Sequence, residues 1–409
     1  MNNNEIYKSV VVCIIALLFI FSGTGFAGTT RITPDKSIQD AIYKSQPGDI
    51  IEIQSGTYFE NVVVTKPLVI RGEDTGSGLP IIDAKGKGSA IILQADGVSL
   101  EDLNFQGASG WDEAGIVIKS NGCTVLNCTA SNNLAIGIYL VGCSNNILIN
   151  NQAFNCNFGI ALNLSSNNTL RNNTMQGNMN NFLSGYSSSD IDTSNQIEGR
   201  PLYYLINKTD IVIDSSSNAG DVYCIGCCNI TIKDLTIEYN FAGIYFQNTS
   251  GSRILNNTLR NNSMGIFFVD SDGNYIEENT LTNNVYGIYL RTNHVNCANN
   301  TISQNNASKN DYGIFLNIEG ERGQSNLIFN NTLIGNKKDN AYSRGQAKWD
   351  NGSAGNRYGD YDELAEGCND SDLNGFCDRP HKIRGGPAVD RYPVIEKMIM
   401  APNRNLREP

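Results

Sequence analysis

Apolar and polar residues alternate in short segments that recur at regular intervals along most of the chain. The phrase Gly-Ile-x-apolar is spaced by 22 residues, apart from one gap of 84 and a last step of 26. It begins at Gly115, Gly137, Gly159, Gly243, Gly265, Gly287 and Gly313. A second phrase, Asn-Asn-Thr followed by an apolar residue, lies between these positions, for example at Asn172 and Asn256. This alternation, bounded by Asn, Gly and Ser, predicts short β-strands joined by turns.

The repeat length restricts how these strands connect. A period of 22 residues that is already occupied by strands has no room for the helix of a βαβ crossover. We therefore expect a solenoid with one coil per period, whose equivalent strands stack in parallel. The second and fourth residues of each Gly-Ile-x-apolar phrase are expected to point inward, as in the pairs Ile138/Leu140, Ile160/Leu162, Ile244/Phe246, Ile266/Phe268, Ile288/Leu290 and Ile314/Leu316. One Asn of each Asn-Asn pair is expected to turn inward and bond to its copies in neighbouring coils.

The solenoid is predicted to cover residues 28–340 and to need a cap at each end. Ile38, Ala41 and Ile42 fall on one face of a short amphipathic helix that suits the N-terminal end. Residues 182–222 depart from the repeat, and we interpret them as an insertion that leaves and re-enters the solenoid. Residues 341–409 break the repeat and are expected to form an irregular C-terminal capping region.

Composition agrees with an all-β fold and excludes several functions. The chain has 56 Asn and 40 Gly among 409 residues, which is atypical of a helical protein. Its formal net charge of −11 argues against a nucleic-acid partner. Lys8, the apolar run 10–21 and the small residues before residue 28 are typical of a signal peptide at residues 1–27. We expect an extracellular or cell-surface protein, which contacts a membrane only if the signal segment stays uncleaved.

Cysteines and glycosylation motifs are numerous. Of the eleven cysteines, ten follow the predicted signal peptide, and some should form disulfides outside the cytosol. The Cys224–Cys227 motif looks superficially like a redox or zinc motif, but the absence of a second CxxC and of a nearby His argues against metal binding there. Fourteen Asn-x-Ser/Thr sequons make a glycoprotein plausible, although an Asn- and Thr-rich repeat produces such motifs by chance.

The C-terminal region contains a candidate calcium loop. Oxygen donors occur at loop positions 1, 3, 5 and 9, with Gly375 at position 6 and a backbone carbonyl at position 7. The predicted ligands are Asp370, Asp372, Asn374, Phe376 and Asp378. Position 12 is His381 rather than Glu, so the loop is shorter than an EF-hand loop. A disulfide between Cys368 and Cys377 would close this loop and lower the entropic cost of ordering it. The expected role of calcium is structural.

Several segments together resemble a known family. Residues 37–64, with Pro47-Gly48-Asp49 and Gly56-Thr57-Tyr58, resemble the opening of pectin-lyase-like right-handed parallel β-helices. Residues 192–204 and the tail motifs at 349–361 and 385–393 are similar to NosD-like proteins. The resemblance implies a single-stranded right-handed parallel β-helix and, for relatives with this tail, an archaeal surface or secreted protein. The family name also implies copper delivery.

The first functional hypothesis is a non-enzymatic surface protein that binds or organises carbohydrate or another cell-surface polymer. The third residue of the Gly-Ile-x-apolar phrase points outward and is often aromatic. The candidate ligand-binding residues are Tyr139, Tyr245, Phe267, Tyr289 and Phe315. Rings stacked on successive coils would form a platform for sugar rings. Packing beneath a neighbouring loop or partner chain is the equally weighted alternative.

Two alternatives stay open. A polysaccharide hydrolase would need two carboxylates at a fixed separation, for which Asp270/Asp272 and Asp190/Asp192 are the candidates, and a lyase would need a basic residue near calcium. The Gly-His-Gly and Arg-x-Lys phrases of hydrolases with this fold are absent, and we predict no catalytic residues. Copper would need His, Cys or Met ligands, but the only histidines are His294 and His381.

Overall fold

The chain folds into stacked coils of short parallel β-strands. The computed structural model describes residues 27–185, 188–294, 296–319 and 325–396, so nearly all of the expected signal peptide lies outside the described residues. Within these ranges, none of the helices has the length and apolar character that a membrane crossing requires. Almost every strand pairs in parallel with a strand about one coil away, which confirms the all-β parallel β-helix.

The N-terminal end is closed by the predicted helix, α2 (Ile38–Lys44). The hydroxyl of Ser37 caps it by accepting a hydrogen bond from the backbone N–H of Asp40 at 3.1 Å. Ile38, Ala41 and Ile42 are the buried residues of this helix, as the sequence predicts. They cover the apolar end of the first coil, next to β1 (Thr29–Ile32) and β2 (Ile50–Gln54).

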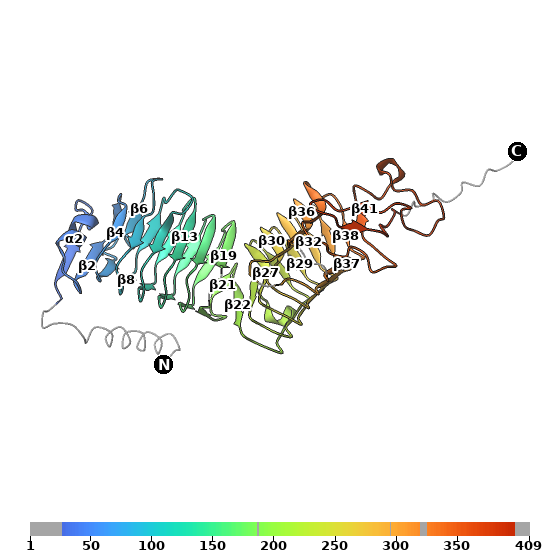
Figure 1. Cartoon of the computed structure of the whole chain (residues 1–409). Coiled ribbons are helices and arrows are strands. Elements are labelled where there is room, and N and C mark those ends of the chain that lie inside the picture. The colour runs from blue at the N-terminus through green and yellow to red at the C-terminus, as the bar shows by residue number, and fades with distance from the viewer. Residues whose placement is uncertain (1–26, 186–187, 295, 320–324, 397–409) are drawn as a thin grey trace.

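The strands form two successive solenoids, which meet at an angle near β19 and β22 (Figure 1). The first solenoid (residues 29–197) has an eight-stranded sheet from β1 to β20 (Asp190–Ile191). Its second sheet is six-stranded and consists of β4 (Val62–Val64), β7 (Ile91–Leu93), β10 (Ala114–Ile118), β13 (Ile136–Val141), β16 (Phe158–Asn163) and β19 (Asn180–Gly185).

The third sheet of the first solenoid continues into the second solenoid (residues 200–358) as one sheet of 14 strands. In the first solenoid its strands are β3 (Thr57–Tyr58), β6 (Ile81–Asp83), β9 (Asn104–Gln106), β12 (Thr129–Ser131), β15 (Gln152–Phe154), β18 (Thr174–Gln176) and β21 (Gln196–Ile197). In the second they are β22 (Arg200–Ile206), β24 (Asp221–Ile225), β27 (Ala242–Gln247), β30 (Met264–Val269), β33 (Tyr286–Arg291), β36 (Tyr312–Asn317) and β39 (Asp339–Ser343).

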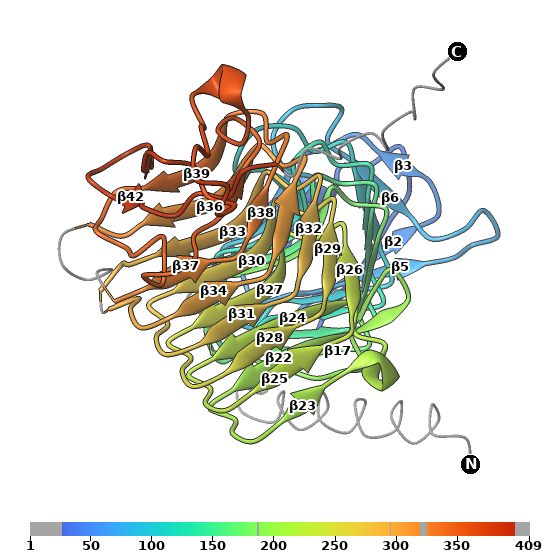
Figure 2. The same cartoon turned by 90° about the vertical axis from the view of Figure 1, so that its right-hand side faces the viewer.

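Two six-stranded sheets complete the second solenoid, and Figure 2 shows their strands stacked side by side. One runs from β23 (Val212–Ile213) to β37 (Leu327–Phe329), and the other from β26 (Thr236–Glu238) to β40 (Arg357–Tyr358). Because β39 and β40 pair with earlier coils, the solenoid extends beyond the predicted boundary at residue 340. The antiparallel pair β41 (His381–Lys382) and β42 (Val389–Asp390) follows in the C-terminal region.

The interior matches the predicted pattern. Every predicted inward pair, from Ile138/Leu140 to Ile314/Leu316, is at most 1% exposed. Buried asparagines also form ladders along the stack. In the ladder of Asn257, Asn279 and Asn305, each side-chain N–H donates to the Oδ1 of the next asparagine at 3.0 Å. The inward Asn of the Asn-Asn-Thr phrase is therefore a structural residue.

The joint between the solenoids corrects our interpretation of residues 182–222. This interval is not an excursion, because β19 to β24 lie in the sheets themselves. β21 and β22 pair antiparallel, with Ile197 opposite Arg200 across Glu198 and Gly199. Both turn residues have positive φ (50° and 74°), as a two-residue type I′ hairpin requires. The chain therefore reverses direction here, and within the shared sheet the strands after the joint run opposite to those before it.

The reversal places the two solenoid interiors on opposite faces of the shared sheet. On β22, Leu202 and Tyr204 belong to the first core, whereas Tyr203 and Leu205 pack against the second core. A strand that is covered on both faces loses the apolar-polar alternation. The outer side of the sheet in the second solenoid consequently faces the first solenoid.

A buried carboxyl group lies at this joint. Asp221 is the first residue of β24, and the backbone N–H of Val222 donates to its Oδ1 at 2.8 Å. Its Oδ2 has no hydrogen-bond partner among the described residues. Burial raises the pKa of Asp221 well above its ordinary value, and the opposing effects of the Val222 N–H and the Arg200 charge are smaller.

Candidate functional site

A cleft of about 400 Å³ lies between the two solenoids. One wall is the outer face of the six-stranded sheet of the first solenoid, and the other is the outer face of the shared sheet in the second. Residues from both walls and from one loop line the cleft: Trp111, Asp112, Ala135, Ile136, Tyr139, Asn157, Phe158, Ala161, Leu162, Asn163, Leu183, Ser184, Gly185, Phe241, Tyr245, Met264, Phe267 and Arg291. We treat this cleft as the candidate binding site.

The first wall is built from the outward residues of β13, β16 and β19. Tyr139, Ala161 and Leu183 are in register on these strands and form a short column. The side-chain N–H of Asn163 donates to the hydroxyl of Tyr139 at 3.1 Å. Ala161, between Tyr139 and Leu183 in this column, also lines the cleft. The wall therefore combines apolar surface with a polar rim, as ligand pockets commonly do.

The second wall is an aromatic column that runs along the shared sheet. The column consists of Tyr204, Tyr223, Tyr245, Phe267, Tyr289, Phe315 and Tyr342, which are in register on seven successive strands. Centroids of neighbouring rings lie 4.4–5.7 Å apart. A second pair, Tyr286 and Tyr312, stacks beside it with centroids 4.9 Å apart. Burial raises the pKa of Tyr286, so this phenol stays neutral at physiological pH.

Four of the five predicted aromatic residues lie in this column, whereas Tyr139 lies on the opposite wall, so the five do not form one ladder. The expectation that these outward rings form an open platform is also wrong for part of the set. Tyr139 is 8% exposed, and Tyr245 and Phe267 are each 3% exposed. These rings are covered because the second solenoid folds back toward the first, which periodicity within one solenoid does not show. Tyr289 and Phe315 are half-buried and lie beyond the covered part of the column.

Several lining residues were not singled out from the sequence. Trp111 is 93% exposed on the loop between β9 and β10, and it lines the cleft together with Asp112. Phe158 and Phe241 face each other from the two solenoids, with ring centroids 6.4 Å apart. The departure of Gly-Trp-Asp from the coil pattern was the only available signal for Trp111. Nothing in the sequence indicated the contact between Phe158 and Phe241.

The candidate carboxylate pairs have other partners. Asp270 accepts hydrogen bonds from the backbone N–H groups of Asn293 and His294, at 2.7 and 3.2 Å, and so orders the turn after β33. Asp190 and Asp192 both form ion pairs with Arg171. None of these carboxylates is among the described residues that line the cleft, where Asp112 is the only acidic side chain.

The predicted calcium loop brings its three aspartates together. One carboxylate oxygen from each of Asp370, Asp372 and Asp378 lies within 4.8 Å of the others. Asn374 is also engaged: its side-chain N–H donates to Asp372 at 2.8 Å, and its Oδ1 accepts the backbone N–H of Phe376 at 2.8 Å. Carboxylate and amide oxygens are the donors that calcium prefers, so the donor set fits this ion.

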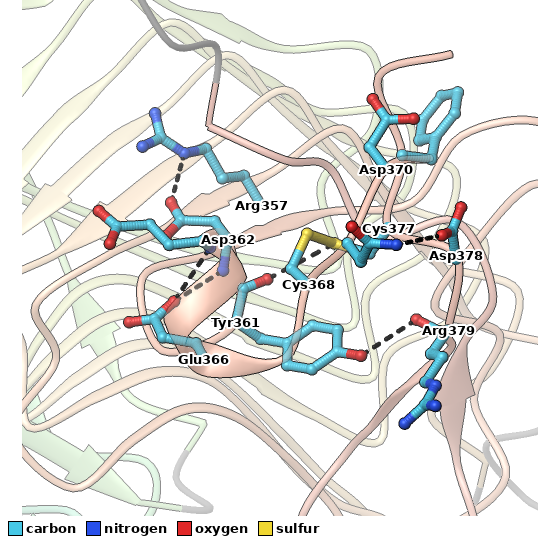
Figure 3. Close-up of a disulfide and its surroundings, with 12 residues drawn as sticks. Arg357, Tyr361, Asp362, Glu366, Cys368, Asp370, Cys377, Asp378 and Arg379 are labelled. Carbon is cyan, nitrogen blue, oxygen red and sulfur yellow. Dashed lines mark hydrogen bonds and ion pairs between the residues drawn. A yellow bond between two sulfur atoms is a disulfide. The ribbon is translucent and has the colours of Figure 1, made fainter. Parts of the chain in front are cut away.

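The structure contains the Cys368–Cys377 disulfide beside this loop (Figure 3). Asp370 and Asp378 lie on the same side of the disulfide in this view, and the hydroxyl of Tyr361 donates to the carbonyl of Arg379 at 3.3 Å. The other eight described cysteines are free thiols, and seven of them are buried.

Three of these thiols occupy positions in the columns of buried asparagines. The backbone N–H groups of Cys123, Cys128 and Cys156 donate to the side-chain oxygens of Asn146, Asn151 and Asn178 in the next coil, at 2.8–2.9 Å. A cysteine at such a position takes the place of an asparagine without burying another amide, as Cys156 does between Asn133 and Asn178. Burial raises the pKa of Cys128 to about 12, which is typical of an inert structural thiol.

The donor sets do not fit copper. Two groups of three or more His, Cys, Asp and Glu side chains come together in the described residues, and both consist of carboxylates. Copper prefers imidazole, thiolate or thioether ligands. His381 packs between the rings of Tyr358 and Tyr361, with centroids 4.3 and 4.8 Å away, and burial lowers its pKa. We therefore derive no copper chemistry from this chain.

Comparisons with known proteins place the chain in a class. A sequence profile described as periplasmic copper-binding protein (NosD) matches residues 191–363, and one described as right handed beta helix region matches residues 38–199. The two matches meet at the β21–β22 joint. The chain is a NosD-like right-handed β-helix protein. No curated protein matches it in sequence.

Solved structures match this chain at low sequence identity and low TM-score. The mannuronan C-5 epimerase AlgE6 A-module of Azotobacter vinelandii is 14% identical, with 76% of this chain and 91% of that chain covered and a TM-score of 0.40. DFA-IIIase of Arthrobacter chlorophenolicus A6 in complex with GF2 is 12% identical, with 75% of this chain and 84% of that chain covered and a TM-score of 0.36. Alginate lyase of Paenibacillus sp. str. FPU-7 is 12% identical, with 72% of this chain and 98% of that chain covered and a TM-score of 0.34. Nothing about ligand or reaction follows from these superpositions.

Proposed function

We propose that this protein is an exported β-helix protein that binds carbohydrate in the cleft between its two solenoids, without catalysing a reaction on it. The observation that carries the proposal is the aromatic lining of both walls. Tyr139 and Phe158 contribute rings from the first solenoid, and Phe241, Tyr245 and Phe267 contribute rings from the second. Aromatic rings offer large apolar faces at small entropic cost, and a sugar ring presents a matching apolar face.

Polar groups at the edges of the cleft support the same ligand class. The side-chain N–H of Asn163 donates to the hydroxyl of Tyr139 at 3.1 Å, and Asn157 and Ser184 also line the cleft. Hydroxyl and amide groups can exchange hydrogen bonds with sugar hydroxyls. A few such groups beside apolar surface fix the orientation of a ligand.

The non-catalytic part of the proposal depends on the carboxylates. Glycoside hydrolysis uses two carboxylates on either side of the scissile bond. Among the described residues that line the cleft, Asp112 has no acidic partner. Export is supported by the signal-like N-terminal segment and by the periplasmic description of the matching family.

Glycan binding with matched variants tests this function. Trp111 is exposed, so Trp111→Ala should leave the fold intact and weaken binding of an array-identified glycan by roughly tenfold, the effect of one lost ring contact of about 1.4 kcal/mol. Tyr43→Ala, an exposed aromatic substitution on α2 away from the cleft, is the control and should not change affinity.

Reducing-sugar and unsaturated-product assays complete the experiment. Binding without turnover supports the proposal, and turnover of the bound glycan would contradict its non-catalytic part. No glycan binding at millimolar ligand, or equal losses in both variants, would overturn the carbohydrate site.

A further inference from the structure

One asparagine ladder of the second solenoid starts directly at the joint. Its members are Asn240, Asn262, Asn284, Asn310 and Asn336, and the backbone N–H of each of the first four donates to the side-chain oxygen of the next at 2.9–3.0 Å. Asn240 is fully buried, and its side-chain oxygen has no hydrogen-bond partner among the described residues. A buried acceptor without a donor is costly, so the start of this ladder needs a hydrogen donor.

Another ladder obtains its first donor from the backbone of the preceding coil. Asn257, for example, accepts the backbone N–H of Leu235 at 3.0 Å. For Asn240 the preceding coil is the joint itself, where its side-chain N–H donates to the carbonyl of Gly220 at 2.8 Å. This bond fixes the orientation of the amide, because a flipped amide would place its oxygen against the Gly220 carbonyl. The Asn240 oxygen therefore faces away from Gly220.

The repeat places the side chain of Asp221 beside this amide. In the parallel pairing of β24 and β27, Asp221 occupies the position that Gly243 has in the following coil. A Cβ atom on Gly243 would lie 3.2 Å from the side-chain nitrogen of Asn262, the ladder residue of its neighbourhood. Asn240 precedes Asn262 in the ladder, so the same relation one coil earlier brings Asp221 to Asn240.

We propose that Asp221 is protonated in the folded protein and that its Oδ2–H group donates to the Oδ1 of Asn240, which starts the ladder. This hydrogen bond gives a partner to both buried oxygens, since the Oδ2 of Asp221 also has none among the described residues. An ionised carboxylate has no hydrogen to donate and would face a second oxygen. The raised pKa of Asp221, caused mainly by burial, agrees with the protonated state.

The titratable groups around Asp221 do not reverse this preference. Arg200 favours the ionised carboxylate, but its effect on the pKa of Asp221 is smaller than that of burial. Burial also raises the pKa of Tyr223 well above its ordinary value, so this phenol stays neutral. The titratable side chains on the paired strands and before Asn240 are Arg200, Tyr203 and Tyr204 on β22, Tyr223 and Cys224 on β24, Tyr245 on β27, and Glu238 and Tyr239.

NMR of the aspartate carboxyl carbons in the full chain measures this titration, with the signal of Asp221 assigned by Asp221→Asn. We expect its midpoint to lie above the ordinary range of aspartate. In Asn240→Ala the protonated form loses its acceptor, so the pKa of Asp221 should fall by roughly one unit. A wild-type midpoint in the ordinary range, or no fall in Asn240→Ala, would overturn the proposal.

Asn284→Ala is the matched control, because Asn284 belongs to the same ladder two coils further on. Its oxygen accepts the backbone N–H of Asn262 at 2.9 Å, and its side-chain N–H donates to Asn310 at 3.0 Å. Its loss therefore weakens the ladder without touching Asp221, whose pKa should stay unchanged. Equal pKa shifts in the two alanine variants would contradict the proposed bond. The wild-type midpoint tests the proposal even if an alanine variant fails to fold.

Discussion

Single asparagines perform two different tasks in each coil. In the Asn-Asn-Thr phrase, the first Asn turns the chain and the second joins the buried ladder. Asn172 and Asn256, for example, have φ values of 53° and 52°, a left-handed conformation that Asn tolerates better than most residues. Thr then starts the next strand, so the phrase creates a sequon without any selection for glycans. Ten of the fourteen sequon asparagines have positive φ, and glycosylation stays a prediction.

The ladder predicts that substituting a buried asparagine lowers the free energy of unfolding far more than substituting a nearby exposed asparagine. Asn279 donates to the carbonyl of Ile254 and to Asn305, and its Oδ1 accepts the backbone N–H of Asn257. Asn279→Ala leaves these buried groups without their hydrogen-bond partner and should lower the free energy of unfolding by about 2–5 kcal/mol. Urea unfolding measures this loss.

The control lies four residues further along the chain. Asn283 is exposed and has a φ of 56°, so Asn283→Gly keeps the left-handed turn and should change stability by less than about 0.5 kcal/mol. Similar losses in the two variants would contradict the ladder's contribution to stability.

At the scale of elements, the periodicity of the sequence predicted the repeated strands and their inward residues, but it did not predict the single reversal of the chain between the solenoids. The 22-residue spacing was enough to identify inward residues such as Ile266 and Phe268, because each strand needs only its own alternation. The reversal at Glu198-Gly199 was not predictable in this way. Arg200–Ile206 reads as a nearly continuous apolar run, which indicates burial on both faces but not which core lies on each side.

The C-terminal loop gives a prediction at the same scale. Three carboxylates whose oxygens lie within 4.8 Å of one another repel unless a cation screens them. We propose that this loop binds calcium as a structural ion. With an affinity of about 0.1–1 mM, 10 mM calcium should stabilise the protein by roughly 1.4–2.7 kcal/mol and raise its melting temperature.

The calcium response is the quantity to compare between variants, since Asp370 also accepts backbone N–H groups of Asn374 and Gly375. The Asp370→Ala, Asp372→Ala double variant should show no calcium-dependent rise, whatever its starting melting temperature. Wild-type protein in 10 mM magnesium is the ion control. Identical calcium shifts in both proteins, or none in either, would refute the site.

At the scale of the whole molecule, the candidate site exists only because two solenoids share one sheet. Tyr245 and Phe267 were correctly assigned to the outer face, yet both belong to the buried cluster of the first solenoid, whose residues lie far earlier in the chain. No local pattern reports such a contact. The joint between the solenoids includes the buried Asp221, which lies with Tyr204 and Tyr223. Because this carboxyl group titrates, the association of the solenoids should respond to pH.

The sign of this response follows from the raised pKa of Asp221. Between the ordinary carboxyl pKa and the raised value, the folded state holds a proton that the unfolded state has lost. The free energy of unfolding therefore falls as pH rises, by up to about 1.4 kcal/mol per pH unit. Asp221→Asn is nearly isosteric and does not titrate. It should match the wild type near pH 4 and exceed its stability by more than about 1 kcal/mol at pH 8, as measured by urea unfolding. Asp234→Asn, at an exposed turn, is the control, and parallel pH profiles of wild type and Asp221→Asn would show that Asp221 does not couple the joint to pH.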